Sequence, residues 1–160
     1  MYISAIGQDS HRFEAEETTK PLVLGGVEIE GCPGLDGNSD ADVILHALTN
    51  AISGISGVNV LGAVSDELCL ERGITDSKIY LHKAIETAHN YRLLHVSISV
   101  EASRPHLSKH MAKIKKSLSQ LLSLPAEHVG LTATTGEGLT ACGRGEGIQA
   151  LVIVSACRRD

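Results

Sequence analysis

The segment from Ile148 to Ala156 is almost continuously apolar, and it constrains the fold more than any other part of the chain. A strand that is apolar on both faces must be covered on both faces, which is typical of a strand in the middle of a sheet. Two further segments, Val96 to Glu101 and Val129 to Ala133, alternate apolar and polar residues and predict half-buried strands. We therefore expect a sheet with the segment from Ile148 to Ala156 at its centre.

The remaining elements follow from local signals. Residues 2–8 predict a first strand, and residues 22–29 predict a hairpin around Gly25 and Gly26. Apolar residues at helical spacing predict three helices: one opened by a capping box at residues 39–42 and closed near Gly57, one from Thr75 to about Tyr91, and one after Pro105. Residues 58–73 have no convincing period and predict a long irregular stretch.

The length of 160 residues fits a single domain, residues 1–160. Strands and helices occur in mixed order, so we expect an α+β fold in which a mixed open sheet carries its helices on one face. Aromatic residues make up only 2% of the chain, so the core must consist of Leu, Ile, Val and Ala. Because two layers leave the other sheet face uncovered, we expect a partner subunit to pack against that face.

Composition also excludes whole classes of protein. The net charge is −5, the basic residues are scattered and stacking aromatics are nearly absent, so we expect no nucleic-acid partner. No apolar stretch approaches membrane-spanning length, and the N-terminus lacks a basic segment followed by an apolar one. We therefore expect a cytoplasmic protein without a membrane partner. Its four cysteines form no CxxC pair, and although an even count permits two disulfides, we expect free thiols because no export signal is seen.

Asp9 and His11 stand two positions apart, directly after the first predicted strand. In an extended chain, side chains two residues apart point to the same side and lie about 7 Å apart along the backbone. A carboxylate and an imidazole can then converge on one cation. Catalytic zinc usually has three protein ligands and an open fourth position, so a third ligand must come from elsewhere in the chain.

His46 is the candidate for that third ligand, because helical spacing places it on the predicted polar face of the first helix. Asp42, one turn earlier, is either a fourth ligand or a carboxylate that orients the imidazole. The plain alternative is that Asp9 is a turn residue and that His11 and His46 are ordinary half-exposed histidines.

Three segments are suited to binding phosphate. Residues 38–40 either cap the first helix or present hydroxyl, amide and backbone N–H groups to an anion. Residues 132–138 enter a Gly-rich loop without the Gly-Lys-Ser/Thr of a Walker A motif, which fits a phosphate with a divalent ion or a plain hairpin equally well. In the second Gly-rich run, residues 143–147, Arg144 either pairs with Glu146 or binds an anion.

Taken together, these motifs resemble the 2-C-methyl-D-erythritol 2,4-cyclodiphosphate synthases of the non-mevalonate isoprenoid pathway. The resemblance covers nearly the whole chain, and it depends on the order and spacing of the motifs because no single one is decisive. The motifs are residues 7–13, 24–26, 38–48, Gly62, Asp76-Ser77, Arg104-Pro105, 132–137 and 143–147.

The resemblance implies a homotrimer packed through the sheets, with active sites between neighbouring subunits. It implies one zinc ion on Asp9, His11 and His46 and a second divalent ion, magnesium or manganese, reached by Glu137. The implied substrate is a cytidine diphosphate ester, 4-diphosphocytidyl-2-C-methyl-D-erythritol 2-phosphate. Its 2-phosphate attacks the β-phosphorus, closes the cyclodiphosphate ring and expels CMP, which is a phosphorus-oxygen lyase reaction.

This chemistry needs no nucleophile from the protein, because the substrate carries its own. The enzyme brings the ends of a flexible polyanion together, and cations neutralise the crowded phosphates. Thr135 matches the family position beside the reacting phosphoryl group, where its hydroxyl could stabilise the transition state, and Asn38 is the second catalytic candidate. The implied substrate contacts are Asn38, Ser39, Gly62, Arg104, Pro105, His106, Thr134, Thr135, Gly136, Glu137 and Arg144.

The chain also departs from the family pattern while keeping the metal ligands. Asn38 stands where the family usually has His; Asn can donate a hydrogen bond to phosphate but cannot carry charge. Val60 stands where a carboxylate is expected to contact substrate hydroxyls. Further departures are Ser65-Asp66-Glu67 for a Phe-Pro-Asp segment, His106 for Lys, Cys142 for Thr or Ser and Ala141 for an aromatic residue.

Two other functions remain open at this point. The charged or polar groups that the family has at the positions of Asn38 and Val60 are lost here. This also fits a catalytically weak or inactive trimeric homologue that binds metal and anions without turnover. A metal-dependent phosphodiesterase that uses water is a weaker alternative. Such sites often hold two metals about 4 Å apart on a carboxylate-rich cluster, whereas the primary site here has only three candidate ligands.

Overall fold

A four-stranded mixed sheet forms the framework of the computed structural model, which describes residues 1–159 apart from the side chains of residues 63, 64 and 68. Its strand order is β1-β6-β4-β5. The strands are β1 (Tyr2–Arg12), β4 (Tyr91–Glu101), β5 (Val129–Thr134) and β6 (Gly147–Arg158). Strand β6 runs antiparallel to both of its neighbours, whereas β4 and β5 are parallel. The prediction that the apolar C-terminal segment lies inside the sheet is confirmed.

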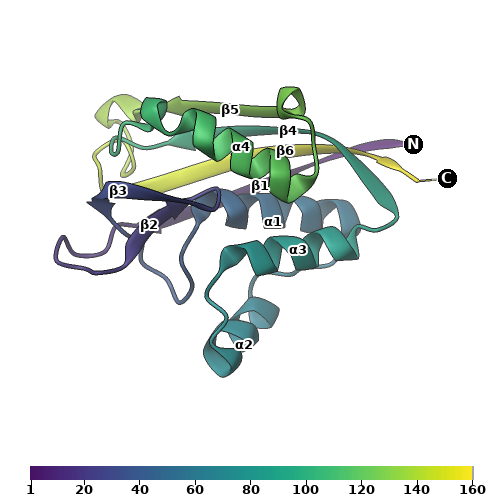
Figure 1. Cartoon of the computed structure of the whole chain (residues 1–160), viewed down its shortest axis with the longest axis horizontal. Helices are drawn as coiled ribbons and strands as arrows, with labels where there is room; N and C mark the ends of the chain where they lie inside the picture. Colours follow the sequence, from purple (N-terminus) through teal and green to yellow (C-terminus); the bar gives the residue numbers. More distant parts are fainter. Residues whose placement is uncertain (160) are drawn as a thin grey trace.

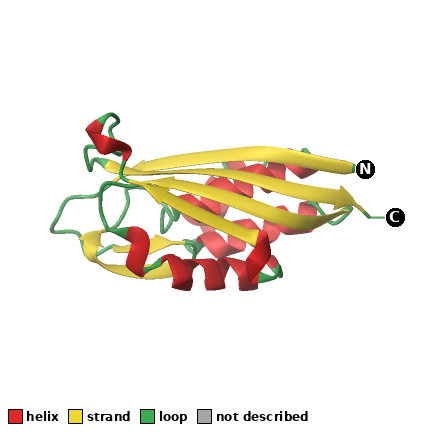
Figure 2. Cartoon of the chain, turned by 90° about the horizontal axis from the view of Figure 1, so that it is seen from above, coloured by secondary structure: helices red, strands yellow, loops and turns green. Residues whose placement is uncertain are grey.

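Three helices cover one face of this sheet: α1 (Val43–Ser56), α3 (Ser77–Thr87) and α4 (Met111–Leu122) (Figures 1 and 2). Helix α1 packs on β1 and β6 and contacts α3, while α4 packs near β5. The core between the layers is aliphatic, with Tyr80 its one large aromatic residue. The expected α+β architecture with helices on one face is therefore confirmed.

The opposite face of the sheet is open within one chain. Residues that alternate with the core positions of β1 and β6 point away from the helices, and Ile6 lies directly across from Ile153. Four of these side chains are large and apolar, with the exposed fractions Tyr2 83%, Ile6 67%, Leu151 41% and Ile153 50%. Exposed side chains of this kind are typical of a surface that binds a partner.

Helix α1 begins differently from the prediction. Asp42, and not the predicted capping box at Ser39, is its N-cap, and its carboxylate accepts a hydrogen bond from the Leu45 N–H. The helix ends at Gly57, which adopts the left-handed region at φ 76°, so the predicted end near this glycine is confirmed. The predicted polar face of this helix is turned inward, since Asp42 is fully buried and His46 is only 9% exposed.

Other boundaries also needed the structure. Residues 58–73, expected to be irregular, contain helix α2 (Ala63–Arg72). Helix α3 is capped by Asp76 rather than Thr75 and ends at Thr87, so that Tyr91 already belongs to β4. The helix expected after Pro105 is divided into a 3-10 turn, η1 (Leu107–Lys109), and α4.

The predicted hairpin is confirmed as β2 (Pro21–Leu24) and β3 (Val27–Pro33), joined by Gly25 and Gly26 at φ 60° and 77°. Both turn N–H groups donate to the Asp42 carboxylate, at 2.9 and 2.7 Å. The hairpin is thereby fixed to the beginning of α1. Two further 3-10 turns, η2 (Ala126–His128) and η3 (Gly136–Gly138), flank β5.

Two expectations about the whole chain can be compared with the structure. All four cysteines are free, as predicted. Among the residues that the structure describes, no helix is long and apolar enough to cross a membrane.

Candidate metal centre

Asp9 and His11 on β1 meet His46 on α1 at the interface between the sheet and the helices. Strand β1 extends to Arg12, so Asp9 and His11 share one face of a regular strand. Asp9 Oδ2 lies 2.8 Å from His11 Nε2 and 3.1 Å from His46 Nδ1. The three candidate ligand atoms all lie within 4.8 Å of one another. The predicted convergence of these residues is confirmed.

A close contact between backbones sets this geometry. Gly7 faces α1 two residues before Asp9, and a Cβ atom there would lie 2.0 Å from the Ala47 carbonyl oxygen and 2.4 Å from the Ala51 nitrogen. Only glycine permits this approach, which brings β1 close enough for Asp9 to reach the imidazole of His46.

His11 presents one ring nitrogen to the centre of the cluster. Its Nδ1 lies 2.7 Å from the Asp36 carbonyl oxygen, which can only accept, so Nδ1 carries the proton. Its Nε2 is buried and makes no hydrogen bond of acceptable geometry, although Asp9 Oδ2 is close. A buried ring nitrogen without a hydrogen-bond partner is suited to a metal ion, so the donor set fits zinc.

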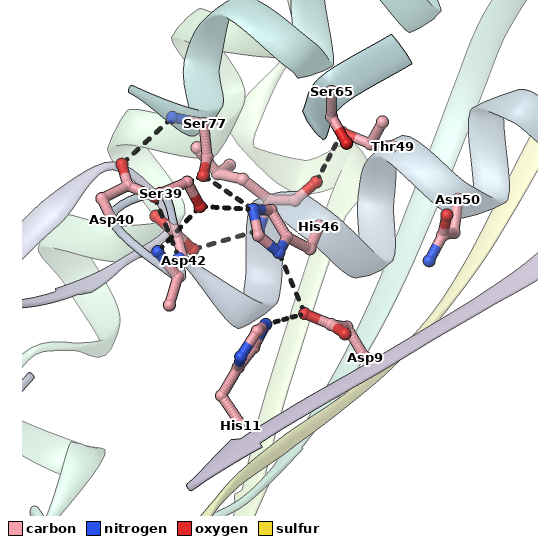
Figure 3. A network of polar contacts seen from close by, with 12 residues as sticks. Asp9, His11, Ser39, Asp40, Asp42, His46, Thr49, Asn50, Ser65 and Ser77 are labelled. Atoms are coloured by element: carbon pink, nitrogen blue, oxygen red, sulfur yellow. Dashed lines mark hydrogen bonds and ion pairs between the residues drawn. The ribbon is translucent and has the colours of Figure 1, made fainter. Parts of the chain in front are cut away.

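His46 lies between Asp9 on one side and two serines on the other (Figure 3). Its Nε2 lies 2.8 Å from Ser77 Oγ, at the beginning of α3, and 3.3 Å from Ser39 Oγ. Ser77 in turn hydrogen-bonds the carboxylate of Asp40. These hydrogen bonds therefore hold the imidazole of His46 through Nε2, the ring nitrogen that faces away from Asp9.

Electrostatics favour a charged carboxylate at the cluster. Burial by itself would raise the pKa of Asp9, but hydrogen bonds and charge from His11 and His46 outweigh it and lower this pKa to about 2. The neighbouring Asp9 carboxylate is also the main cause that raises the pKa of His11, against the opposing effect of burial. The cluster thus combines an ionised carboxylate with two imidazoles, and a divalent cation would replace the imidazole proton between them.

Asp42 is not part of this cluster, so its predicted role as a ligand or as the partner of the His46 imidazole is wrong. Its carboxylate points toward the hairpin and accepts three backbone N–H groups, from Gly25, Gly26 and Leu45. Burial raises its pKa to about 6, against those hydrogen bonds. Helical spacing alone could not distinguish a cap from a ligand.

A pocket of about 240 Å³ adjoins His11 and His46, two of the candidate metal ligands. It brings Asn38 and Ser39, predicted to bind substrate, beside His11 and His46, and Leu61, next to Gly62, lines it too. Six of its residues were not predicted as site residues: Gly37, Leu61, Ser65, Asp66, Cys69 and Tyr80. The thiol of Cys69 donates to the Asn38 carbonyl at 3.0 Å, and only the placement of α2 reveals this contact.

A second pocket, of about 290 Å³, lies where β4 and β5 end near η1. It collects four predicted substrate contacts: Pro105, His106, Thr134 and Thr135. Apolar side chains that were not predicted, among them Ala102, Leu107 and Met111, form the rest of its wall. Within one chain, this pocket shares no lining residue with the pocket at the metal ligands.

The loop after β5 holds the remaining acidic candidate. Glu137 is exposed, with φ 51°, and accepts a hydrogen bond from Thr135 Oγ1 at 3.2 Å. It is not among the described groups whose ligand atoms converge with those of Asp9, His11 and His46. Gly136, also predicted to contact substrate, has φ 74° and packs against Glu101, which explains why glycine stands there.

The two arginines predicted to contact substrate make internal ion pairs. Arg104 lies 4.5 Å above the Phe13 ring and hydrogen-bonds Glu16 at 2.7 Å. Arg144 Nε lies 3.0 Å from Glu146, whose other carboxylate oxygen lies 3.3 Å from Arg12. The pairing of Arg144 with Glu146, left open by the sequence, is therefore present.

Fold and site together define a class: a mixed-sheet α+β protein with an Asp–His–His cluster that could hold a metal ion at the junction of a strand and a helix. The model of the YgbB family matches residues 2–156, and the chain belongs to this family. A protein of Chlamydia trachomatis serovar L2b (strain UCH-1/proctitis) is 43% identical over 162 residues, covering 99% of this chain and 91% of its own length. A protein of Chlamydia abortus (strain DSM 27085 / S26/3) is 43% identical over 156 residues, covering 97% and 89%. Both are named 2-C-methyl-D-erythritol 2,4-cyclodiphosphate synthase.

Solved structures show the same fold. A 2C-methyl-D-erythritol-2,4-cyclodiphosphate synthase in a form bound to CDP is 32% identical, with a TM-score of 0.79, over 97% of this chain and 100% of its own. The bifunctional IspDF from Campylobacter jejuni is 29% identical, with a TM-score of 0.89. It covers all of this chain, which corresponds to only 43% of that longer protein.

Proposed function

We propose that this chain is a metal-dependent cyclase that converts 4-diphosphocytidyl-2-C-methyl-D-erythritol 2-phosphate to 2-C-methyl-D-erythritol 2,4-cyclodiphosphate and CMP. The observation that carries the proposal is the convergence of Asp9, His11 and His46 beside a pocket that Asn38 and Ser39 line. The curated relatives bear the name of this activity over nearly the full chain, and one solved structure holds CDP. The four free cysteines are in keeping with a cytoplasmic setting.

The residues of this chain bind and orient a polyanion. Asp9, His11 and His46 would hold zinc, and the bound cation would supply positive charge to neutralise the phosphate oxygens. Ser39 and Asn38 line the adjoining pocket, where hydroxyl and amide groups can donate hydrogen bonds to a phosphate. Because the 2-phosphate of the substrate is the nucleophile, catalysis consists of holding it in line with the β-phosphorus.

Thr135 and Glu137 serve the leaving side of the reaction in this proposal. The hydroxyl of Thr135 lines the second pocket and would donate a hydrogen bond to the phosphoryl oxygens as charge develops. Glu137 is exposed beside Thr135 and would bind the second divalent ion, magnesium or manganese. The apolar wall of the second pocket, with Pro105, His106 and Thr134, is suited to the flat cytosine base.

We further propose a homotrimer packed through the open sheet faces, with the active site completed between subunits. Two observations support it. The open face of β1 and β6 exposes apolar side chains, including Ile6 and Ile153. The pocket at the metal ligands and the pocket lined by Thr135 are separate within one chain, although a single substrate must reach both. Arg144, in its ion pair with Glu146, is placed near the trimer axis in this proposal, where it would bind an anion.

Incubation of the purified protein with the cytidine diphosphate ester, zinc and magnesium tests the function, with CMP measured by chromatography and the second product by ³¹P NMR. We expect CMP and a cyclic diphosphate in equal amounts. Ligand binding without CMP release would instead favour the inactive binding homologue, to which Asn38 and Val60 point. An open-chain, hydrolysed product would favour the phosphodiesterase.

A further inference from the structure

The hydrogen bonds behind His46 determine which of its ring nitrogens faces the cluster. Nε2 of His46 lies 2.8 Å from Ser77 Oγ, and this hydroxyl has a single proton to donate. Ser77 Oγ also makes a short hydrogen bond to Asp40 Oδ1, and a carboxylate can only accept. The serine proton therefore lies toward Asp40, and the serine oxygen is left to accept a proton from His46 Nε2.

We infer that Ser77 and Asp40 are a positioning pair that keeps the Nε2 proton of His46 in place, so that Nδ1 is the nitrogen left to bind the cation. Nδ1 is the nitrogen that faces Asp9, at 3.1 Å. Ligating histidines commonly donate their second ring nitrogen to a carboxylate or carbonyl, which fixes the tautomer and the ring orientation. Here the hydroxyl of Ser77 relays that interaction to the carboxylate.

Asp40 is held in place from several sides. Its Oδ2 accepts the Ser77 N–H at 3.1 Å, and its Oδ1 accepts the Asp42 N–H at 3.1 Å. Its own N–H donates to the Thr75 carbonyl at 2.9 Å. Asp40 thus connects the beginning of α1 with the beginning of α3, so the position of the His46 imidazole depends on how these two helices pack.

The arrangement is different at His11, which makes a useful comparison. There a backbone carbonyl, that of Asp36, accepts the Nδ1 proton and leaves Nε2 for the cation. The two imidazoles therefore use different nitrogens: Nε2 in His11 and Nδ1 in His46. Only the His46 arrangement depends on side chains, so mutation can test it.

The inference rests on the proposed metal site but not on the proposed reaction, and zinc affinity is its measure. Competition with a chromogenic chelator would give the zinc affinity of the full-length protein. We expect Ser77→Ala to weaken it by about 10- to 100-fold. Ser77→Thr keeps the hydroxyl and should restore it to within about 3-fold of wild type, since the interaction is retained. Asp40→Asn should also weaken zinc binding, because the acceptor loses its charge.

Asp76→Ala is the matched control. Asp76 caps α3 through the Lys78 N–H, one residue before Ser77, without contacting His46. This variant should lower stability and leave zinc affinity unchanged. If Ser77→Ala weakens zinc no more than Asp76→Ala does, Ser77 has only a structural role and the inference is wrong.

A second readout is spectroscopic. In the zinc-loaded wild-type protein, ¹⁵N chemical shifts of the His46 ring distinguish the metal-bound nitrogen from the protonated one. We expect Nδ1 to be bound and Nε2 to carry the proton, and the cobalt-loaded protein should change its visible absorption in Ser77→Ala. The opposite nitrogen assignment would overturn the inference and leave the proposed function standing. A wild-type protein that does not bind zinc would overturn both.

Discussion

Asp9 Oδ2 lies 3.1 Å from His46 Nδ1, although the two residues are 37 positions apart and belong to a strand and a helix. This contact joins the two elements, β1 and α1, that form the candidate cation site. We predict that His46→Ala weakens zinc binding by at least about 100-fold and abolishes CMP release, since one of three ligands is lost. Chelator competition and CMP chromatography would measure the two effects. His82→Ala, on the exposed side of α3, is the control and should behave as wild type.

The effect of His46→Ala should be confined to the candidate metal site and leave the fold intact. Its circular dichroism should match that of the wild type, because the substitution removes a side chain from the edge of the core and not from its centre. A zinc-free His46→Ala protein that still releases CMP would contradict the assignment of the metal site.

Gly7 sets the separation of β1 from α1. We predict that Gly7→Ala destabilises the protein by about 3 kcal/mol or more, because the new methyl group would lie 2.0 Å from a backbone oxygen of α1 and the elements must move apart. Chemical denaturation would measure the change. Gly130→Ala is the control, since its Cβ would lie 3.5 Å from the nearest atom, the Val96 carbonyl oxygen. Equal stabilities of the two variants would show that β1 and α1 do not pack as closely as described.

Asp42 gives a pH dependence of stability with a definite sign. Burial raises its pKa from 3.8 to about 6, so the folded protein holds a proton between these values that the unfolded chain releases. The free energy of unfolding should therefore fall as pH rises from about 4 to 6, by at most roughly 3 kcal/mol from this group.

Urea denaturation at several pH values would test this, with Asp42→Asn as the comparison. The variant cannot titrate, so the difference in stability between it and the wild type should change across that pH interval. The pKa of Asp9, lowered to about 2, acts below pH 4 and outside this interval. A difference that stays constant with pH would contradict the prediction.

Substitution of Thr135 tests the proposed catalytic step independently of metal binding. We predict that Thr135→Ala lowers kcat by about 10- to 1,000-fold, because a hydrogen bond to the transition state is lost, while zinc affinity stays the same. Steady-state kinetics of CMP release would measure it. Thr132→Ala, on β5 three residues earlier, removes a hydroxyl that donates to the Ile98 carbonyl, and it should leave kcat within about 2-fold. Wild-type turnover by Thr135→Ala would remove this residue from the mechanism.

Ile153, 50% exposed on the open sheet face, tests the assembly. We predict that Ile153→Asp converts a trimer to monomers and abolishes activity, because a carboxylate would be buried without a partner between subunits. Sedimentation velocity gives the mass. Val58→Asp replaces another exposed apolar residue, 47% exposed and outside the sheet, and should remain trimeric. A monomeric wild-type protein would contradict the proposed trimer itself.

Local patterns predicted much of the framework. The continuous apolar segment of β6, the alternation in β4 and β5 and the glycine turn between β2 and β3 are all properties of neighbouring residues, and they predicted the correct elements. Helix α2 was missed because residues 58–73 lack a clear apolar stripe. The boundaries of α1 and α3 were misplaced because several Ser, Thr and Asp residues stand close together and each could serve as a cap.

At the site, the sequence by itself predicted the three candidate ligands that the structure brings together, since Asp9 and His11 share a strand face by spacing alone and His46 belongs to a motif of the family pattern. Only the tertiary structure decided the roles of their neighbours. In the structure, Asp42 binds the hairpin and does not belong to the candidate metal site, and Ser77 and Asp40 lie behind His46. The physical reason is that spacing along a chain fixes which side of an element a residue faces, whereas the partner on that side depends on how distant elements pack.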